Sequence, residues 1–253
     1  MTKRDIPALP RGGACVVVGA TGGIGQALAE AASASGAFAR VLRLSRAGAP
    51  GGHIAPDITV DITVDITDEA SVKAAAASVA DVCRVTPLRL VLDATGFLHD
   101  NAHQPEKSWR DLDPAHLAKA FSVNAIGPAL LMKHFLPLLP REGKAVFATL
   151  SAKVGSIADN RLGGWYAYRA SKAALNQLVR TAAVELARRR PDAIAVALHP
   201  GTVDTRLSQP FAKTGLAVRP PEEAAALLLG VVERLTPAMS GGFYDYRGDP
   251  LPW

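Results

Sequence analysis

The chain has 253 residues, of which 49% are hydrophobic and 20% charged, so it can form a large core and global disorder is excluded. The net charge of +5 is spread along the sequence and accompanies no nucleic-acid-binding motif, so we expect no nucleic-acid partner. No apolar stretch reaches the roughly 18 residues of a membrane span. The two cysteines, Cys15 and Cys83, indicate neither a disulfide framework nor a metal site. We therefore expect one cytoplasmic domain without a metal.

Strand and helix patterns alternate along the chain. The expected strands are Cys15–Val18, Val41–Leu44, Ile62–Val64, Leu88–Leu92, Ala145–Leu150, Ile194–Leu198 and Gly242–Tyr244. The expected helices are Ile24–Ser35, Glu69–Val82, Pro114–Leu139, Trp165–Arg190 and Glu222–Leu235. The strands are short and almost wholly apolar, which is typical of a parallel sheet covered on both faces. This order predicts an α/β fold with a doubly wound parallel β-sheet and helices on both faces, in a single domain over residues 1–253.

Three segments fall outside these elements. Residues 1–12 are interpreted as a flexible lead-in to the first strand. Residues 57–67 contain the tandem repeat DITV-DITV-DIT, which is too short for a repeat fold and is interpreted as a duplication that lengthens a loop. Residues 205–216 contain proline, lysine and glycine, and we expect them to form a lid over the functional site.

The segment GATGGIG, from Gly19 to Gly25, follows an apolar strand and begins a helix. Such a turn predicts a site for phosphate groups, because the amides at a helix N-terminus attract anions. We expect Gly19 to permit the tight turn, Gly23 to let the backbone approach a pyrophosphate, and Gly25 to let the helix pack on the sheet. Glycine-rich turns are also common without any ligand, so this motif needs support from the rest of the chain.

The end of the second strand indicates which dinucleotide this turn would hold. In such folds an acidic residue at this point bonds the ribose 2′-hydroxyl, whereas an arginine accommodates a 2′-phosphate. The chain has Ser45 and Arg46 there, with Arg43 nearby and no acid. Because a guanidinium makes bidentate contacts to phosphate, the sequence predicts NADP(H) rather than NAD(H). The alternative is that Arg46 is an ordinary surface arginine.

Tyr168 and Lys172 lie four residues apart in YRASK, within an expected helix. This spacing places the phenol and the ammonium on one face, one turn apart. We expect the ammonium to lower the pKa of the phenol, so that Tyr168 can donate a proton to a carbonyl as a hydride arrives. The alternative is that Y-x-x-x-K is a chance pattern.

Asn124 lies inside the expected helix over Pro114–Leu139, four residues before Pro128. Proline has no N–H, so the carbonyl of Asn124 loses its helical partner there and the helix should kink. A water bound at that carbonyl and linked to Lys172 would form a proton relay. The alternative is that Gly127 and Pro128 merely bend the helix.

Taken together, these motifs resemble the short-chain dehydrogenase/reductase family over nearly the whole chain, and within it the C-factor-like and sniffer-like carbonyl reductases. The resemblance implies a Rossmann fold, an Asn-Ser-Tyr-Lys tetrad, and a homodimer or homotetramer joined through two long helices. The matching segments are GATGGIG, Asp65, DATG at 93–96 (where the family commonly has NNAG), Asn124, the region of Ser151, YRASK, and HPGTVDT at 199–205.

The resemblance also implies a set of residues that would contact the cofactor. By this likeness Asp65 and Ile66 would contact the adenine, and Ala94 and Gly96 would line the cofactor groove. The segment from Pro200 to Val203 would approach the carboxamide. The whole set is Gly19, Thr21, Gly23, Ile24, Gly25, Ser45, Arg46, Asp65, Ile66, Ala94, Gly96, Tyr168, Lys172, Pro200, Gly201, Val203 and Thr205.

One residue departs from the family pattern. The family usually has S-S-x-x-G with a catalytic second serine, and Ala152 occupies that position here. We take Ser151 as the candidate, although strand alternation points its side chain to the opposite face unless a bulge turns it. Ser156 is a further candidate. Without a hydroxyl, carbonyl orientation would depend on Tyr168 alone.

These features predict an NADP(H)-dependent oxidoreductase whose partner is a small molecule. It would reduce a ketone, aldehyde or quinone carbonyl, or oxidise the matching alcohol, with Tyr168 as proton donor and Asn124, Ser151 and Lys172 in support. The alternative is a cofactor-binding sensor or signalling protein with weak or no catalysis, which Ala152 favours and the complete set of Asn124, Tyr168 and Lys172 disfavours.

Overall fold

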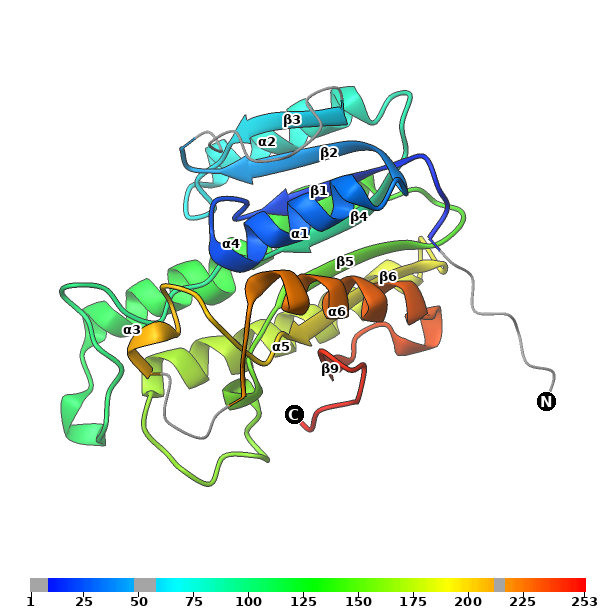
Figure 1. The fold of residues 1–253 in the computed structure, drawn as a ribbon. Coiled ribbons are helices and arrows are strands. Elements are labelled where there is room, and N and C mark those ends of the chain that lie inside the picture. Colours follow the sequence, from blue (N-terminus) through cyan, green and yellow to red (C-terminus); the bar gives the residue numbers. More distant parts are fainter. Residues whose placement is uncertain (1–8, 48–57, 212–216) are drawn as a thin grey trace, which may run out of the picture.

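The computed structural model describes residues 9–47, 58–211 and 217–253. Within these residues, seven parallel strands form one sheet in the order β3-β2-β1-β4-β5-β6-β9 (Figure 1). Their bounds are β1 Gly13–Val18, β2 Phe38–Ser45, β3 Thr59–Thr63, β4 Leu88–Asp93, β5 Ala145–Leu150, β6 Ala193–His199 and β9 Phe243–Asp245. The predicted parallel sheet is confirmed.

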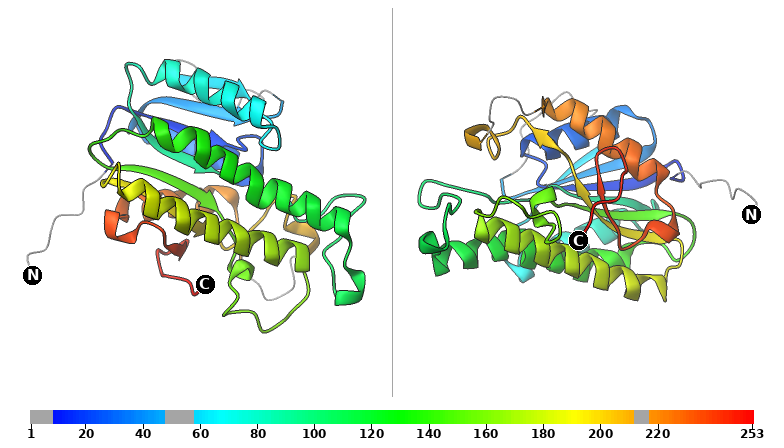
Figure 2. Two further views of the ribbon diagram at one scale, coloured as in Figure 1. Left: turned by 180° about the vertical axis from the view of Figure 1, so that it is seen from behind. Right: turned by 90° about the horizontal axis from the view of Figure 1, so that it is seen from below.

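Helices cover both faces of the sheet. Helices α1 and α6 pack together on one face, and α2, α4 and α5 lie side by side on the other, as the rear view in Figure 2 shows. Their bounds are α1 Gly23–Ala34, α2 Glu69–Val82, α3 Pro114–Phe121, α4 Gly127–Phe135, α5 Tyr166–Ala187 and α6 Pro221–Arg234. None of the helices in the described ranges is long and apolar enough to cross a membrane.

The strands are apolar along their whole length because each face packs against helices. In β1, Val16 and Val18 belong to the core beneath α2, α4 and α5, whereas Cys15 and Val17 belong to the core beneath α1 and α6. All six residues of β1 are buried. Burial on both faces explains why the sequence shows continuous apolar runs instead of alternation.

The strand order reverses direction between β1 and β4, which are neighbours in the sheet. Connections from β1 run to one side of the sheet and connections from β4 to the other. In doubly wound sheets the loops at the carboxyl edge separate at such a point and leave a crevice for ligands. The topology therefore places the candidate site at the carboxyl ends of β1 and β4.

Several predicted boundaries were wrong in informative ways. The expected helix over Pro114–Leu139 is divided into α3, a π-helical turn at Ser122–Ile126 and α4. Pro128 follows that turn, so the expected break near Asn124 is present. β3 begins at Thr59, before the expected strand Ile62–Val64, so it includes part of the DITV repeat that was expected in a loop. After β6, β7 (Thr202–Val203) pairs with β8 (Val218–Arg219) in a small second sheet.

The two expected mobile segments are only partly described. Residues 1–8 and 212–216 lie outside the described residues. Of the expected lead-in, Leu9 is buried in the core and its amide donates to Glu233. Of the expected lid, residues 209–211 form a single 3-10 turn.

Candidate active site

The glycine-rich turn after β1 is built so tightly that side chains are excluded. Gly19 has φ +80°, and a Cβ there would lie 3.2 Å from the carbonyl of Ala94. A Cβ on Gly25 would lie 2.1 Å from the carbonyl oxygen of Gly19. Gly22 occupies the N-cap of α1, where it has no side chain to bond the first-turn amides. Those amides are thus a place for phosphate oxygens, which fits a dinucleotide cofactor.

The segment after β6 packs against this glycine-rich turn. Pro200 and Val203 are buried, and Gly201 has φ +80°. Thr205 approaches so closely that a Cβ on Gly23 would lie 2.9 Å from its Cγ2. The structure therefore brings Thr205, which follows the predicted carboxamide segment at residues 200–203, to the predicted phosphate turn. Of the turn's remaining predicted contacts, Thr21 is exposed and Ile24 is half-buried.

The end of β2 presents one arginine instead of two. Arg43 is buried and forms a bidentate ion pair with Asp61 of β3, at 2.7 Å for each contact. That pairing occupies its guanidinium, so Arg43 serves the sheet. Arg46 is exposed one residue beyond the strand, and the hydroxyl of Ser45 donates to the carbonyl of Ala47 to shape this turn.

The two predicted adenine contacts follow β3. Asp65 accepts hydrogen bonds from the amide and hydroxyl of Thr67, and these bonds lower the pKa of its carboxyl group. Ile66 is buried against Gly127, where a Cβ would lie 2.7 Å from its Cδ1. The turn at 65–67 is thus fixed by its own carboxylate and by the start of α4.

A buried carboxylate ends β4. Asp93 accepts from the hydroxyl and amide of Thr95, at 2.6 and 3.1 Å, and from the hydroxyl of Thr149 at 2.6 Å. These bonds hold the DATG segment against β5. Ala94 donates its amide to Val18 of β1, which places both predicted groove residues, Ala94 and Gly96, at the switch point of the sheet.

Asn124 connects helix α5 to the segment that follows β4. It is fully buried, and its side chain makes two hydrogen bonds of 2.7 Å with the backbone of Phe97. Its amide also donates to Ser171 of α5 at 3.0 Å. A Cβ on Gly96 would lie 3.8 Å from Oδ1 of Asn124 and 4.0 Å from Nζ of Lys172. Asn124 and Lys172 therefore flank the same glycine at the carboxyl edge.

Tyr168 and Lys172 lie on the inner face of α5. Lys172 is buried, and its Nζ donates to the carbonyl of Leu150 at 2.7 Å. The same Nζ is 6.0 Å from the centroid of the Tyr168 ring. Burial lowers the pKa of Lys172 to about 8, although the charge of Asp93 acts in the opposite direction.

The expectation that Lys172 lowers the pKa of Tyr168 was wrong for this state of the protein. Burial instead raises the pKa of Tyr168 to about 12. The ammonium is bonded to Leu150 and is itself desolvated, so its attraction for a phenolate does not overcome the loss of water around the ring oxygen. Tyr168 is therefore protonated throughout the neutral range.

Both candidate serines donate their hydroxyl hydrogen bonds to groups other than Tyr168. Ser151 follows the strand alternation, and its hydroxyl donates to Oδ1 of Asn176 at 2.7 Å. Ser156 donates to the carbonyl of Trp253 at 3.2 Å. No bulge re-aims Ser151 within the described part of β5 and β6, whose pairing is regular. The bulge that could have re-aimed Ser151 is therefore absent from the described residues, and the catalytic role of Ser151 stays a prediction.

An aromatic cluster that the motifs did not predict lies in front of Tyr168. The ring of Trp165 is 6.2 Å from that of Tyr168 and 5.2 Å from that of Phe211, both edge to face. Phe211 in turn packs 5.2 Å from the ring of His99. These residues come from three loops that lie far apart in the sequence and are brought together by the fold.

The comparisons with known proteins agree with this geometry. Residues 19–227 match a family model described as enoyl-(acyl carrier protein) reductase. C-signal of Myxococcus xanthus is 39% identical over 144 residues, which are 56% of this chain and 82% of that protein. The 1-hydroxy-2-glutathionyl-2-methyl-3-butene dehydrogenase of Rhodococcus sp. is 36% identical over 143 residues, 56% of this chain and 61% of that enzyme.

Solved structures extend the likeness to almost the whole chain. The NADPH-bound carbonyl reductase from chicken fatty liver is 28% identical, with a TM-score of 0.82 over 96% of this chain and 100% of that one. A short-chain dehydrogenase/reductase from Burkholderia multivorans with bound NADP is 27% identical, with a TM-score of 0.74 over the same shares. The chain therefore belongs to the short-chain dehydrogenase/reductase family and is an oxidoreductase that uses a nicotinamide cofactor.

Proposed function

We propose that the protein is an NADP(H)-dependent reductase of a ketone, aldehyde or quinone carbonyl, which also oxidises the matching alcohol in reverse. The observation that carries the proposal is the convergence of Asn124, Tyr168 and Lys172 at the switch point of the sheet, beside Gly96. A protein that only binds the cofactor needs the phosphate turn, but it has no use for a half-buried phenol and a buried ammonium on one helix face.

The proposed chemistry divides the work between cofactor and protein. The cofactor supplies a hydride when it is bound. Tyr168 is protonated at neutral pH and donates its proton to the carbonyl oxygen. Lys172 holds positive charge near the phenol and stabilises the phenolate left after transfer. Asn124 fixes α5 to the segment after β4 through Ser171 and Phe97.

The preference for NADP(H) is part of the proposal. It is supported by Arg46 at the end of β2 and by the bound cofactors named for the chicken and Burkholderia proteins. The residues that would hold the pyrophosphate are the first-turn amides of α1. The carboxamide would meet the segment from Pro200 to Val203, and Asp65 and Ile66 would border the adenine.

The absence of a hydroxyl at position 152 favours a slow enzyme. In the proposal Tyr168 orients the carbonyl largely alone, and Ser151 contributes only if its bond to Asn176 opens when substrate binds. The rival function is a cofactor-binding sensor with weak or no catalysis. Ala152 is the observation in its favour.

Steady-state oxidation of NADPH and NADH against a panel of ketones, aldehydes and quinones separates the two functions. The reductase predicts turnover of at least one carbonyl class, faster with NADPH than with NADH. Cofactor binding detected by nicotinamide fluorescence, with no carbonyl-dependent oxidation across the panel, would instead establish the sensor. A homodimer or homotetramer is part of the proposal and is measurable on the same sample by light scattering.

A further inference from the structure

Helix α5 carries the proposed proton donor, and the backbone at its N-cap has an unusual conformation. Trp165 occupies its N-cap with φ +53°, a left-handed conformation that L side chains rarely adopt. The indole makes no capping hydrogen bond to any described residue. The start of α5 must therefore be held by groups from elsewhere in the chain.

Glu106 supplies these groups from the loop between β4 and α3. Its backbone carbonyl accepts the amide of Trp165 at 2.5 Å. Both oxygens of its carboxylate lie 3.2 Å from the amide of Ala167, in the first turn of the helix. Glu106 thus caps α5 from a distance of about 60 residues in sequence, where a negative charge also favours the positive end of the helix dipole.

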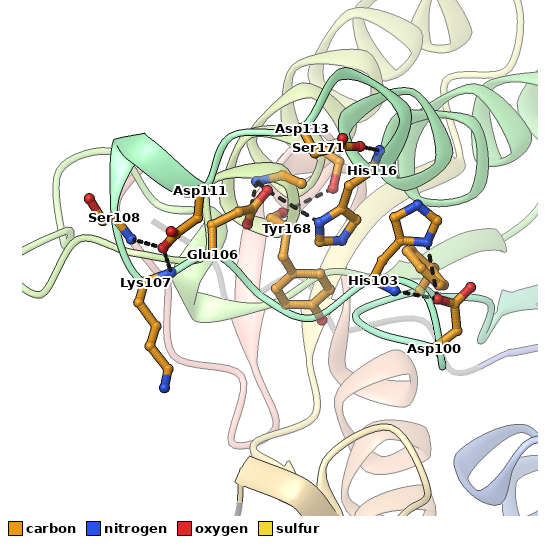
Figure 3. A network of polar contacts seen from close by, with 12 residues as sticks. Asp100, His103, Glu106, Lys107, Ser108, Asp111, Asp113, His116, Tyr168 and Ser171 are labelled. Carbon is orange, nitrogen blue, oxygen red and sulfur yellow. Dashed lines mark hydrogen bonds and ion pairs between the residues drawn. The ribbon is translucent and has the colours of Figure 1, made fainter.

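The carboxylate itself is held in place from behind. Glu106 is 3% exposed, and its Oε1 lies 3.4 Å from Nδ1 of His116 on α3. Figure 3 shows the side chains of Glu106 and His116 turned toward each other. A buried carboxylate with an amide on one side and an imidazole on the other has little freedom to move.

Close packing and hydrogen bonds also restrain the segment before α5. Gly164 has φ +66°, and a Cβ there would lie 3.2 Å from the carbonyl oxygen of Glu106. Arg169 donates to the carbonyls of Gly164 and Val154, which ties the same turn down from within the helix. Tyr168 directly follows Ala167, so any shift of this first turn moves the phenol.

We propose that Glu106 is a positioning residue for the proton donor: its carboxylate anchors the first turn of α5 and thereby fixes the phenol of Tyr168. This inference rests on the proposed reductase function. Reaction rates fall steeply with small errors in the placement of a reacting group, whereas the affinity for a cofactor that has most of its proposed contacts on other elements changes much less. Glu106 should therefore affect turnover much more than cofactor affinity.

The test compares Glu106→Ala, Glu106→Gln and Glu106→Asp in the full-length chain, with NADPH and the carbonyl that the wild type reduces fastest. We expect Glu106→Ala to lower kcat about 10- to 100-fold, while KM for NADPH changes less than about twofold. Glu106→Gln should recover most of the rate, because its amide oxygen still accepts from Ala167. Glu106→Asp should remain slow, because its shorter side chain withdraws from that amide. The Gln and Asp variants decide the matter if the Ala variant does not fold.

Asp111→Asn is the matched control. Asp111 belongs to the same loop, but its carboxylate accepts from the amides of Lys107 and Ser108 and does not touch α5. Its kcat should equal that of the wild type. An unchanged kcat in Glu106→Ala, or equal losses in the Gln and Ala variants, would overturn the proposal.

Hydrogen exchange of the peptide that contains Ala167 keeps this test apart from the proposed function. Its exchange should be faster in Glu106→Ala than in the wild type, with or without activity. If the wild type reduces no carbonyl, the proposed function fails while the exchange still tests the anchor. If exchange at Ala167 is unchanged, the anchor fails whatever the activity.

Discussion

At the scale of single residues, the site depends on burying groups that water would otherwise stabilise. Lys172 is charged below a pKa of about 8, and its Nζ has one backbone carbonyl, that of Leu150, as its hydrogen-bond acceptor within the described residues. The pKa of Tyr168 shifts in the opposite direction, because burial raises it to about 12. Both shifts favour the uncharged forms, and both make the pair costly to charge.

This burial predicts a pH-dependent stability. The unfolded chain holds the Lys172 proton up to its ordinary pKa of 10.5, whereas the folded protein releases it near 8. The unfolded state binds more protons at this group between these values, so the contribution of Lys172 to the free energy of unfolding rises with pH across this window, by about 3 kcal/mol. Urea unfolding of the wild type and of Lys172→Met from pH 7 to 10.5 measures it. The variant should lack the rise, and parallel curves would contradict the assignment.

Arg46 carries the prediction on cofactor choice. Arg46→Asp should raise KM for NADPH at least about tenfold and leave KM for NADH unchanged or lower, because the carboxylate repels a 2′-phosphate and accepts from a 2′-hydroxyl. Arg40→Asp is the control, since Arg40 is an exposed arginine near the opposite end of β2. Unaltered selectivity in Arg46→Asp would remove Arg46 from the phosphate site.

At the scale of elements, the break between α3 and α4 allows α4 to pack on the segment after β3. Gly127 begins α4, and its α-carbon meets Ile66. The π-helical turn before it turns the side chain of Asn124 toward Phe97. The π-helical turn and the start of α4 thus each carry one of these contacts.

The prediction at this scale compares two helix glycines. Gly127→Ala places a Cβ 2.7 Å from Cδ1 of Ile66 and should lower the free energy of unfolding by about 1–3 kcal/mol. Gly230→Ala in α6 meets only the end of Arg234, at 3.4 Å, and should raise it by up to about 1 kcal/mol. Denaturant unfolding of both variants tests the packing. Equal stabilities would show that Ile66 yields to the new methyl group.

The sequence predicted features whose causes are local. The apolar strands, the Gly19–Gly25 turn and the one-turn spacing of Tyr168 and Lys172 are each written within a few consecutive residues. The break after Asn124 was predicted because a single proline causes it. The structure confirms the fold and brings Asn124, Tyr168 and Lys172 to one edge of the sheet.

Features that depend on distant partners could not be predicted in this way. The bond from Ser151 to Asn176 and the cap of α5 by Glu106 each join segments that no periodicity connects. The direction of the Tyr168 pKa was predicted wrongly, because the spacing to Lys172 is visible in the sequence and the burial of both groups is not. The pairing of Arg43 with Asp61 was likewise decided by strand register.

At the scale of the whole molecule, one sheet edge collects everything that the proposed reaction needs. β1 ends in the phosphate turn, β4 in the segment beside Asn124, and β6 in the loop that reaches Gly23. Helix α5 lies on the sheet face that α2 and α4 also cover, and it carries Tyr168 and Lys172. The proposed site residues lie at the carboxyl ends of these strands, and none of them lies at the amino-terminal ends.

Transfer of deuterium from NADPH labelled at C4 of the nicotinamide to the carbonyl carbon of a substrate tests this account most directly. The wild type should form deuterated alcohol, and Tyr168→Phe should form it at least about 100-fold more slowly while binding NADPH with the same affinity. Deuterium transfer at the wild-type rate in Tyr168→Phe would show that another group donates the proton and would contradict the assignment of the site.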